Sequence, residues 1–559
     1  MPEAEGGWRW TAWVGPAVLF VHLLGAAPEF HGVWPDEQIY LDMARSLARG
    51  EGFRLDSLPL APETAKYPPA WPLLLSCLLR AGVDADTTGG IFVFHALSAG
   101  FWAIAAQVAV SALVPGFGGG RSAQLMAGLL LTLNTVTMKL IPNGMSEGLF
   151  TAALTGALAL GIGMAERPNS RTGLGLFALA ALAALTRSVA SPLLLLAALA
   201  ALAARRWSLA APLALAWLAQ SLLVRLVRAG ITPLSAEAER VVHYYVSYRE
   251  HLAYYSAPAL AGEIATFQTR LLSTVIHNAG LAGDSLGTLV YPARMLGIEE
   301  GASGTTTTGV VGLATLAAAL ACGRHSRAAR AASAFLLAYA AVFVAWTWPF
   351  SSRFWLPVFP LVLALVAAAS CQFGNIPRLL AWPLTGLLLL GNVMSPVYRL
   401  MALWQWEGGL AARQAAADES VGTTALRGLV RPDDVILGPH FAPALGRGVP
   451  ARAMELEALL PADLRLGLML GHVSSTADAA ELASELDHSL RVLLGLLPAD
   501  ATVWVVVNPA LDSSGQRRLA PLLTGLVEKG RIEPALDTPN ARAWRVTRHV
   551  DEESLTPAL

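Results

Sequence analysis

The first 400 residues contain about eleven long apolar segments, and these constrain the fold more than any other feature. A straight membrane-spanning helix needs about 20 predominantly apolar residues. Only 14% of the 559 residues are charged, whereas a soluble globular domain carries about a quarter. The sequence therefore predicts an all-α polytopic membrane protein. The predicted spans are Trp10–Ala27, Ile91–Val114, Ala123–Ile141, Leu149–Met164, Leu174–Thr186, Pro192–Ala204, Trp207–Val227, Thr308–Cys322, Ala331–Trp348, Phe354–Ser370 and Leu379–Val397.

Charge and cysteine content exclude several classes of protein. The formal net charge of −1 and the lack of a long basic cluster argue against nucleic-acid binding. The three cysteines lie in or beside apolar segments, and their spacing fits neither a disulfide framework nor a metal site.

Basic residues set the expected orientation, because cytoplasmic loops are enriched in Lys and Arg. With a cytoplasmic N-terminus and eleven spans, three basic clusters fall in the cytoplasm. Counting the short apolar stretch Ala70–Leu79 as a further span would place them outside, so it is predicted to be an interfacial or re-entrant helix. The clusters are Arg167/Arg171, Arg205/Arg206 and Arg324/Arg327/Arg330.

This orientation gives a transmembrane domain over residues 1–400 and places three regions outside the cytoplasm. Two are loops, residues 28–69 and residues 228–307. The third is a C-terminal domain, residues 401–559, where charged residues return. Strand-like and helical stretches alternate in it, which predicts a small α/β domain. The stretches are Asp434–Gly438, Ala477–Leu497, Thr502–Asn508 and Ser513–Lys529.

The first outer loop predicts a short amphipathic helix between Pro35 and Gly50, with an apolar face every four residues, suited to a membrane surface. Asp36 and Glu37 lie on its first turn. Acids there stabilise the helix dipole, so a purely structural role is one reading. The other is base chemistry on a lipid-borne substrate at the membrane surface.

Lys66 precedes Tyr67-Pro68-Pro69 and the apolar stretch that follows. A lysine at a membrane interface commonly serves as a snorkelling anchor. It also offers the compact cation that a phosphate site needs.

These residues resemble the GT-C superfamily of membrane glycosyltransferases, which includes protein O-mannosyltransferases and lipid A aminoarabinose transferases. The resemblance rests on Asp36, Glu37 and Tyr40 followed by the K-Y-P-P sequence. Three later motifs agree and also fall on the predicted outer side. They are Pro142-Asn143-Gly144-Met145-Ser146-Glu147, Leu185-Thr186-Arg187 and Ser352-Arg353-Phe354-Trp355-Leu356-Pro357-Val358-Phe359-Pro360. No W-W-D motif is present, which argues against en bloc transfer to asparagine.

Arg187 lies between two short apolar runs, and a charge at membrane depth is by default functional or paired. Glu147 and a substrate phosphate are the two candidate partners.

The resemblance implies a polyprenyl-phosphate sugar as donor and a hydroxyl of a glycan, lipid or protein as acceptor. It implies Asp36 as general base with inversion, and Glu37 as an orienting residue. Lys66 and Arg353, then Arg187, are implied to stabilise the departing phosphate, with Tyr40, Tyr67 and Glu147 completing the substrate site. The implied location is a plasma (inner) membrane, with the site and the C-terminal domain extracytoplasmic. No cofactor is expected, although some relatives use a divalent metal.

Other interpretations stay open from the sequence. A transporter or flippase of lipid-linked sugars would explain the spans and Arg187, and a non-catalytic envelope scaffold would explain the C-terminal domain. The second outer loop carries an aromatic helical face that fits an interface belt or a rim for sugar or lipid. It consists of Tyr244, Tyr248, His251 and Tyr255.

Overall fold

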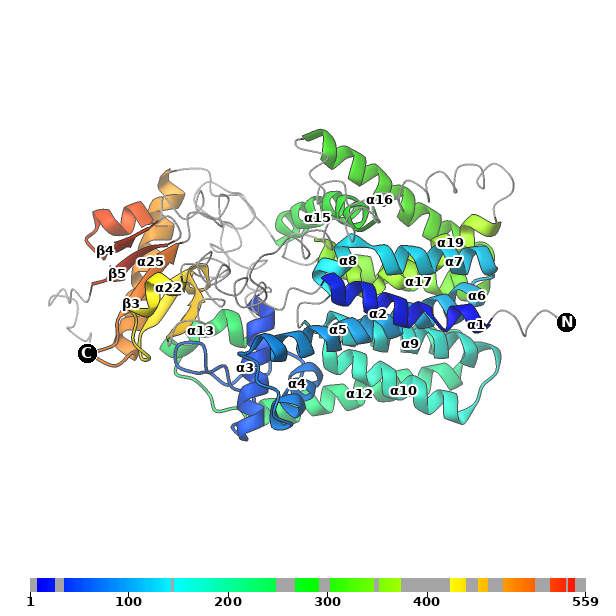
Figure 1. The fold of residues 1–559 in the computed structure, drawn as a ribbon, viewed down its shortest axis with the longest axis horizontal. Coiled ribbons are helices and arrows are strands. Elements are labelled where there is room, and N and C mark those ends of the chain that lie inside the picture. Colours follow the sequence, from blue (N-terminus) through cyan, green and yellow to red (C-terminus); the bar gives the residue numbers. More distant parts are fainter. Residues whose placement is uncertain are drawn as a thin grey trace. The chain divides into compact units, whose positions relative to one another are not determined.

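The computed structural model describes residues 8–25, 35–141, 145–247, 267–290, 302–345, 351–372, 423–438, 451–460, 476–507, 523–538 and 541–547. The chain forms two compact units (Figure 1). The helical unit comprises Met1–Pro28, Tyr67–Gly230 and Thr269–Glu407, and the mixed unit comprises Glu29–Lys66, Ile231–Gln268 and Gly408–Leu559. The predicted domain boundary at residue 400 stays a prediction.

Most of the predicted spans lie within helices of the helical unit. The described helices of this unit are α1 (Trp8–Thr11), α2 (Val14–Gly25), α4 (Ala70–Arg80), α5 (Thr88–Val108), η1 (Ala109–Leu113), α6 (Val114–Gly116), α7 (Arg121–Leu133), α8 (Thr135–Leu140), α9 (Glu147–Glu166), α10 (Ser170–Thr186), α11 (Ala190–Ala203), α12 (Trp207–Ala229), α15 (Phe267–Val290), α16 (Ala302–Cys322), α17 (Arg327–Val344), α18 (Ser352–Trp355), η3 (Leu356–Val358) and α19 (Phe359–Gln372).

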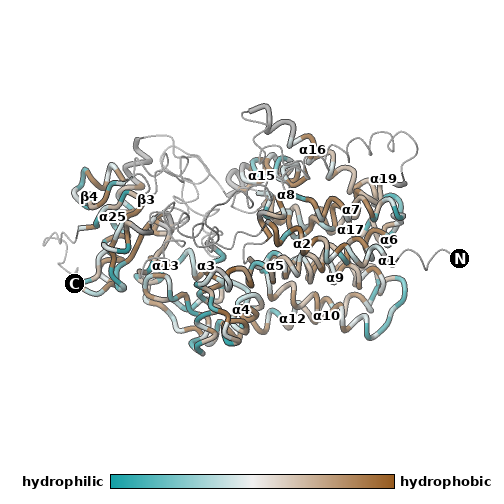
Figure 2. The backbone as a smooth tube through the Cα atoms, viewed as in Figure 1, coloured by the Kyte–Doolittle hydropathy of each residue, from teal (hydrophilic) through white to brown (hydrophobic). Residues whose placement is uncertain are grey.

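Five helices of the described residues are long and apolar enough to cross a membrane: Gly89–Gly116, Glu147–Glu166, Trp207–Ala229, Arg327–Val344 and Ser352–Ser370. Figure 2 shows the apolar character of the helical unit. The prediction of an all-α polytopic membrane fold is therefore confirmed. The count of eleven spans stays a prediction, and Leu379–Val397 lies outside the described residues.

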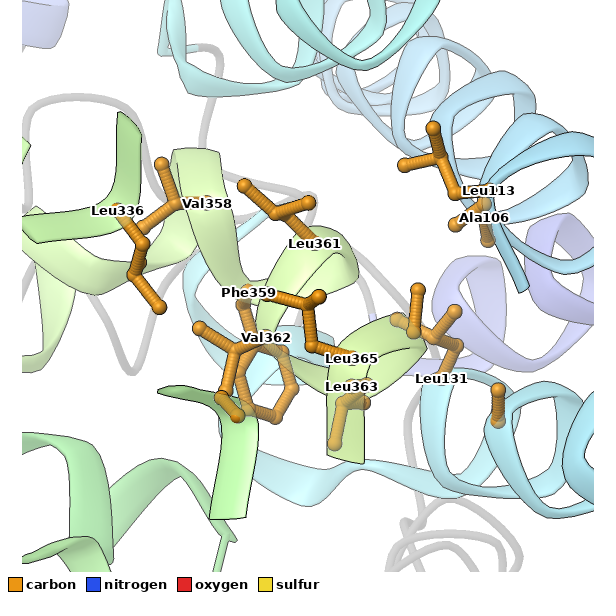
Figure 3. Packing of buried hydrophobic residues seen from close by; sticks show 14 of the residues in the cluster. Ala106, Leu113, Leu131, Leu336, Val358, Phe359, Leu361, Val362, Leu363 and Leu365 are labelled. Carbon is orange, nitrogen blue, oxygen red and sulfur yellow. The ribbon is translucent and has the colours of Figure 1, made fainter. Parts of the chain in front are cut away.

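Burial separates central helices from peripheral ones. In the 18-residue apolar stretch of Ser352–Ser370, 78% of the residues are buried in the protein. The corresponding share in Trp207–Ala229 is 22%. A helix that is apolar on all sides belongs in an interior, and the side chains of α19 pack in several directions (Figure 3). The exposed apolar residues of α12 fit a helix that faces lipid.

Asn134 divides the predicted span Ala123–Ile141 into two helices. It follows the last residue of α7 and caps α8, where its Oδ1 accepts a hydrogen bond from the backbone N–H of Thr137 at 2.8 Å. Its amide Nδ2 donates to the carbonyl of Leu289 in α15 at 2.6 Å. Asn is a favoured N-cap, so the break follows from the sequence even though apolarity alone hides it.

The segment predicted as the second outer loop, residues 228–307, contains two helices among its described residues. These are α15, in the helical unit, and α13 (Ala236–Val246), in the mixed unit. The 24-residue α15 carries Arg270, His277 and Asp284, and these charged or polar residues lower its apolarity below that of a recognisable span. Its residues Leu286 and Leu289 nevertheless lie in the apolar core.

Helices α15 and α16 approach each other through glycines. A Cβ on Gly287 would lie 1.7 Å from the carbonyl oxygen of Thr308, and one on Gly312 would lie 1.8 Å from that of Gly283. Small residues four apart allow such backbone contact in membrane proteins. Asp284 accepts a hydrogen bond from the Thr308 hydroxyl across the same seam.

The mixed unit begins with α3 (Pro35–Arg49), which has the predicted start and end. Gly50 follows in the left-handed region with a φ of 82° and ends the helix as expected. Ile39 and Met43 on the apolar face are buried in the protein. The expected membrane-surface face is thus covered by the chain itself.

The C-terminal part of the mixed unit is a small α/β fold, as predicted. Strands β2 (Arg452–Glu455), β1 (Val435–Gly438) and β3 (Val503–Val507) are parallel, and β5 (Arg542–Val546) and β4 (Ile532–Asp537) extend the sheet antiparallel in the order β2-β1-β3-β5-β4. The described residues of β1 and β3 are buried on both faces, which is typical of central parallel strands. The remaining described elements are α22 (Thr423–Arg427), η4 (Leu456–Leu459) and α25 (Thr476–Leu496).

Candidate functional site

One buried carboxylate holds two arginines in the helical unit. Glu147 Oε1 lies 2.6 Å from Arg187 Nη1 and 2.5 Å from Arg353 Nε. The Glu147 side chain is 2% exposed, and those of Arg187 and Arg353 are 17% and 14% exposed. We call these three residues the arginine cluster. It confirms Glu147 as a partner of Arg187 and shows that Arg353 shares it.

Each member stands at or near the end of a helix. Glu147 is the first residue of α9, Arg187 follows the last residue of α10, and Arg353 lies in the short helix α18. Residues 142–144 of the first motif lie outside the described residues. Helix ends bring charged side chains to the margin of an apolar bundle, where burying their charge costs least.

Three hydrogen bonds fix the backbone around Arg353. The Ser352 hydroxyl donates to the carbonyl of Ser285 at 3.0 Å, and the Trp355 indole N–H donates to that of Ala282 at 3.0 Å. The buried Tyr339 hydroxyl donates to the carbonyl of Phe354 at 2.7 Å. These contacts hold the segment that carries the arginine. Tyr339 was not predicted, because an aromatic residue within an apolar span has no distinguishing pattern.

The arginine cluster gathers two guanidiniums around one carboxylate. Among the described residues, Glu147 Oε2 is buried without a hydrogen-bond partner. A buried carboxylate oxygen is costly without a donor, so this oxygen is suited to accept a hydrogen bond.

The acidic pair occupies the first turn of α3 in the mixed unit. Glu37 and Tyr40 are buried, with 2% and 4% exposure, whereas Asp36 is partly exposed. Asp36 is the more accessible of the two acids for proton transfer.

Lys66 is buried in the mixed unit and bound by α13. Its Nζ donates to the carbonyl of Tyr244 and lies 4.3 Å from the centroid of the Tyr244 ring. Both roles considered for Lys66, an interfacial anchor and a phosphate ligand, stay predictions. Tyr67, the next residue, belongs to the helical unit and is 8% exposed.

Sequence reasoning missed Asp42, one helical turn after Gln38. It is buried, and its Oδ2 accepts hydrogen bonds from the backbone N–H of Ser57, at 2.9 Å, and from the Ser57 hydroxyl. Burial raises the pKa of Asp42 to about 6, while the Ser57 hydrogen bonds oppose the shift. Asp42 ties the first outer loop to α3.

The described residues contain no group of three or more His, Cys, Asp or Glu side chains that could hold a metal. The expectation that no metal cofactor is needed stays a prediction. Of the aromatic face in the second outer loop, only Tyr244 lies in the described residues, and its ring packs edge-on against Tyr245 at 4.8 Å.

No family profile matches the sequence, and no curated protein matches it. Among solved structures, the chain is similar to ArnT from Cupriavidus metallidurans, a crystal structure bound to undecaprenyl phosphate. The identity is 13%, the TM-score is 0.51, and the match covers 97% of this chain and 98% of ArnT.

A second match is to the arabinofuranosyltransferase AftD from mycobacteria, with 16% identity and a TM-score of 0.42 over 96% of this chain and 40% of AftD. ArnT is a lipid A aminoarabinose transferase of the GT-C superfamily, and the likeness to it runs over nearly the whole of both chains. The chain shares the GT-C fold of ArnT.

Proposed function

We propose that this protein is a glycosyltransferase that moves a sugar from a polyprenyl-phosphate donor to an acceptor hydroxyl on the extracytoplasmic side of a plasma (inner) membrane. The observation that carries the proposal is the arginine cluster, in which one buried carboxylate holds two guanidiniums. The GT-C fold supports it, since the ArnT structure was solved with undecaprenyl phosphate bound.

The arginine cluster supplies what the departing group of such a reaction needs. When the bond between the anomeric carbon and the phosphate breaks, negative charge grows on the phosphate oxygens. Fixed cations in a water-poor site stabilise that charge without reorganisation. Arg187 and Arg353 are held by Glu147 and so are fixed in advance. Arginine also matches phosphate geometry with two parallel N–H donors.

Glu147 has a second role in the proposal. Its Oε2, buried and without a partner among the described residues, can accept a hydrogen bond from a hydroxyl of the sugar. A site that pairs a carboxylate with substrate hydroxyls discriminates strongly against substrates that lack them.

The acids of α3 supply the base. Asp36 accepts the proton of the acceptor hydroxyl as its oxygen attacks the anomeric carbon and the phosphate leaves, which inverts the configuration. Glu37, which is buried, orients Asp36, and Tyr40 contributes to the substrate site. Lys66 and Tyr67 complete the phosphate-binding set in this proposal.

The experiment measures binding of undecaprenyl phosphate and of undecaprenol to the purified protein in nanodiscs. Arg353→Gln should weaken binding of undecaprenyl phosphate roughly 10- to 100-fold, the value of a charge-assisted hydrogen bond, and leave undecaprenol binding unchanged. Arg225→Gln removes an exposed arginine from α12 of the same unit and should change neither. Equal affinity of wild-type protein for both lipids would overturn the proposal.

A further inference from the structure

We propose that the C-terminal α/β fold sets the position of the Lys66 ammonium through helix α13, with Tyr244 as the positioning residue. This inference rests on the proposed function, because it treats Lys66 as a ligand of the donor phosphate. It gives the C-terminal part of the chain a role in substrate binding.

Lys66 contacts the C-terminal turn of α13. Tyr244 is two residues before Val246, the last residue of that helix. The carbonyls of a final turn lack partners within the helix and carry the negative end of its dipole. The ammonium donates to one of them, that of Tyr244, while the Tyr244 ring lies beneath it.

The backbone next to Lys66 is attached to the same turn. The Thr64 hydroxyl donates to the carbonyl of Tyr245 at 3.2 Å and accepts from the backbone N–H of Lys66 at 3.0 Å. Glu63 accepts from the backbone N–H of Thr232 at 2.8 Å, just ahead of α13. Both the side chain of Lys66 and the backbone beside it are thus attached to α13 by hydrogen bonds.

Helix α13 is in turn held by the α/β fold. It packs against η4 and α25, and its residues Val241, Val242 and Tyr245 are fully buried. Arg240 forms an ion pair with Glu485 of α25, with a distance of 3.2 Å. The Ser235 hydroxyl caps the other end of α13 by accepting from the backbone N–H of Ala238 at 3.1 Å.

The acidic helix is fixed to the same fold by a second route. Ala453 of the edge strand β2 donates its backbone N–H to the carbonyl of Ser57 at 2.8 Å. Ser57 in turn donates to Asp42 on α3. The α/β fold therefore supports both Lys66 and the helix that carries Asp36 and Glu37, and a displacement of the fold would move these groups together.

The first test measures the affinity for undecaprenyl phosphate, with undecaprenol as the phosphate-free probe. Tyr244→Leu keeps the backbone carbonyl and removes the ring, so it should weaken phosphate-lipid binding by roughly 3- to 30-fold, the range of a desolvated cation–π contact. Tyr244→Phe keeps the ring and should restore most of the affinity. Undecaprenol binding and the melting temperature should change little in both variants.

A double-mutant cycle separates this inference from the proposed function. Lys66→Ala should weaken phosphate-lipid binding by itself, and adding Tyr244→Leu should then have no further effect. If Lys66→Ala binds normally, the assignment of Lys66 in the proposed function is wrong. If Lys66→Ala is impaired but Tyr244→Leu binds normally, or if the two effects add, the positioning role is overturned.

The contribution of the α/β fold is tested at the ion pair between α13 and α25. Glu485→Arg should weaken phosphate-lipid binding by a few-fold, within the range of an exposed pair, because it repels Arg240. Combining it with Arg240→Glu should recover the loss. A loss in the single variant that the reversed pair does not recover, or no loss at all, would contradict control by the C-terminal fold.

Discussion

Single residues of the mixed unit show how burial changes the chemistry of a carboxylate. Asp36 and Asp42 lie on the same helix, but Asp36 is partly exposed and Asp42 is fully enclosed. The pKa of Asp42 is raised to about 6 by desolvation, the largest cause. The folded protein therefore binds this proton more tightly than the unfolded chain does.

Linkage gives the sign of the resulting pH dependence. Stability from the Asp42 proton is fully present below the unfolded pKa near 4 and is lost as pH rises through about 6, by about 3 kcal/mol for a shift of this size. Asp42→Asn keeps an acceptor for Ser57 and has no proton to lose. The free energy of unfolding of wild-type protein should therefore fall between pH 4 and pH 6.5 relative to that of the variant.

Chemical denaturation across this pH range provides the measurement. Asp433→Asn, at an exposed position of the same unit, is the control and should track wild type. A wild-type stability that rises relative to Asp42→Asn over this range would show that the sign is wrong.

Residue-level prediction from sequence succeeded where charge alone decides the partner. Arg187 was expected to be functional or paired, with Glu147 and a substrate phosphate as candidate partners, and Glu147 is bound to it. Arg353 binds the same Glu147 oxygen, although the two residues are 206 positions apart. Lys66 and Tyr244, which are also in contact, are 178 positions apart. Local pattern carries no information on such pairs, so the structure was needed to find them.

At the scale of elements, helix limits followed from local chemistry. Pro35 and Gly50 predicted the ends of α3. Strands β2, β4 and β5 and helix α15 were missed. Strand β4 contains Pro534 and a mostly exposed surface, and α15 is too polar for a hydropathy criterion. Tertiary contacts override propensity in both cases.

The close approach of α15 and α16 at Gly287 gives a prediction at this scale. Gly287→Ala places a methyl group 1.7 Å from a backbone oxygen of α16, so α15 and α16 must separate, and the carbonyls of Ala282 and Ser285 should move from the Arg353 segment. We expect a lower melting temperature and weaker binding of undecaprenyl phosphate.

Gly280→Ala in the same helix is the matched control, because nothing lies within 4 Å of its Cβ position. Replacing a helical glycine by alanine stabilises by about 0.5–1 kcal/mol where space allows, so this variant should melt at or above the wild-type temperature. Equal behaviour of the two variants would mean that the close approach of α15 and α16 is absent.

At the scale of the whole molecule, apolarity and charge predicted a polytopic helical protein with a small α/β part, and the GT-C fold is confirmed by the likeness to ArnT. The association of the first outer loop with the C-terminal part in one compact unit could not be predicted. It depends on backbone hydrogen bonds such as that between Ala453 and Ser57. The hydropathy pattern of a sequence does not reveal such bonds.

Orientation is the prediction that belongs to this scale. The basic clusters place the loops after Met164, Arg206 and Arg327 in the cytoplasm. Reporter fusions at these positions should be active only as cytoplasmic reporters, and fusions after Asn143 or at the C-terminus only as external ones. A cytoplasmic C-terminus would refute the eleven-span topology.

The most direct measurement of the central claim is release of polyprenyl phosphate from polyprenyl-phosphate sugars by the purified protein in lipid, with an acceptor present. Wild-type protein should release it. Asp36→Asn should lower the rate by about 10²–10⁴-fold, the contribution of a positioned general base, while Glu37→Gln has a smaller effect and donor affinity stays unchanged in both. Near-normal release by Asp36→Asn would remove the base from the mechanism, and no release by wild-type protein from any such donor would contradict the account.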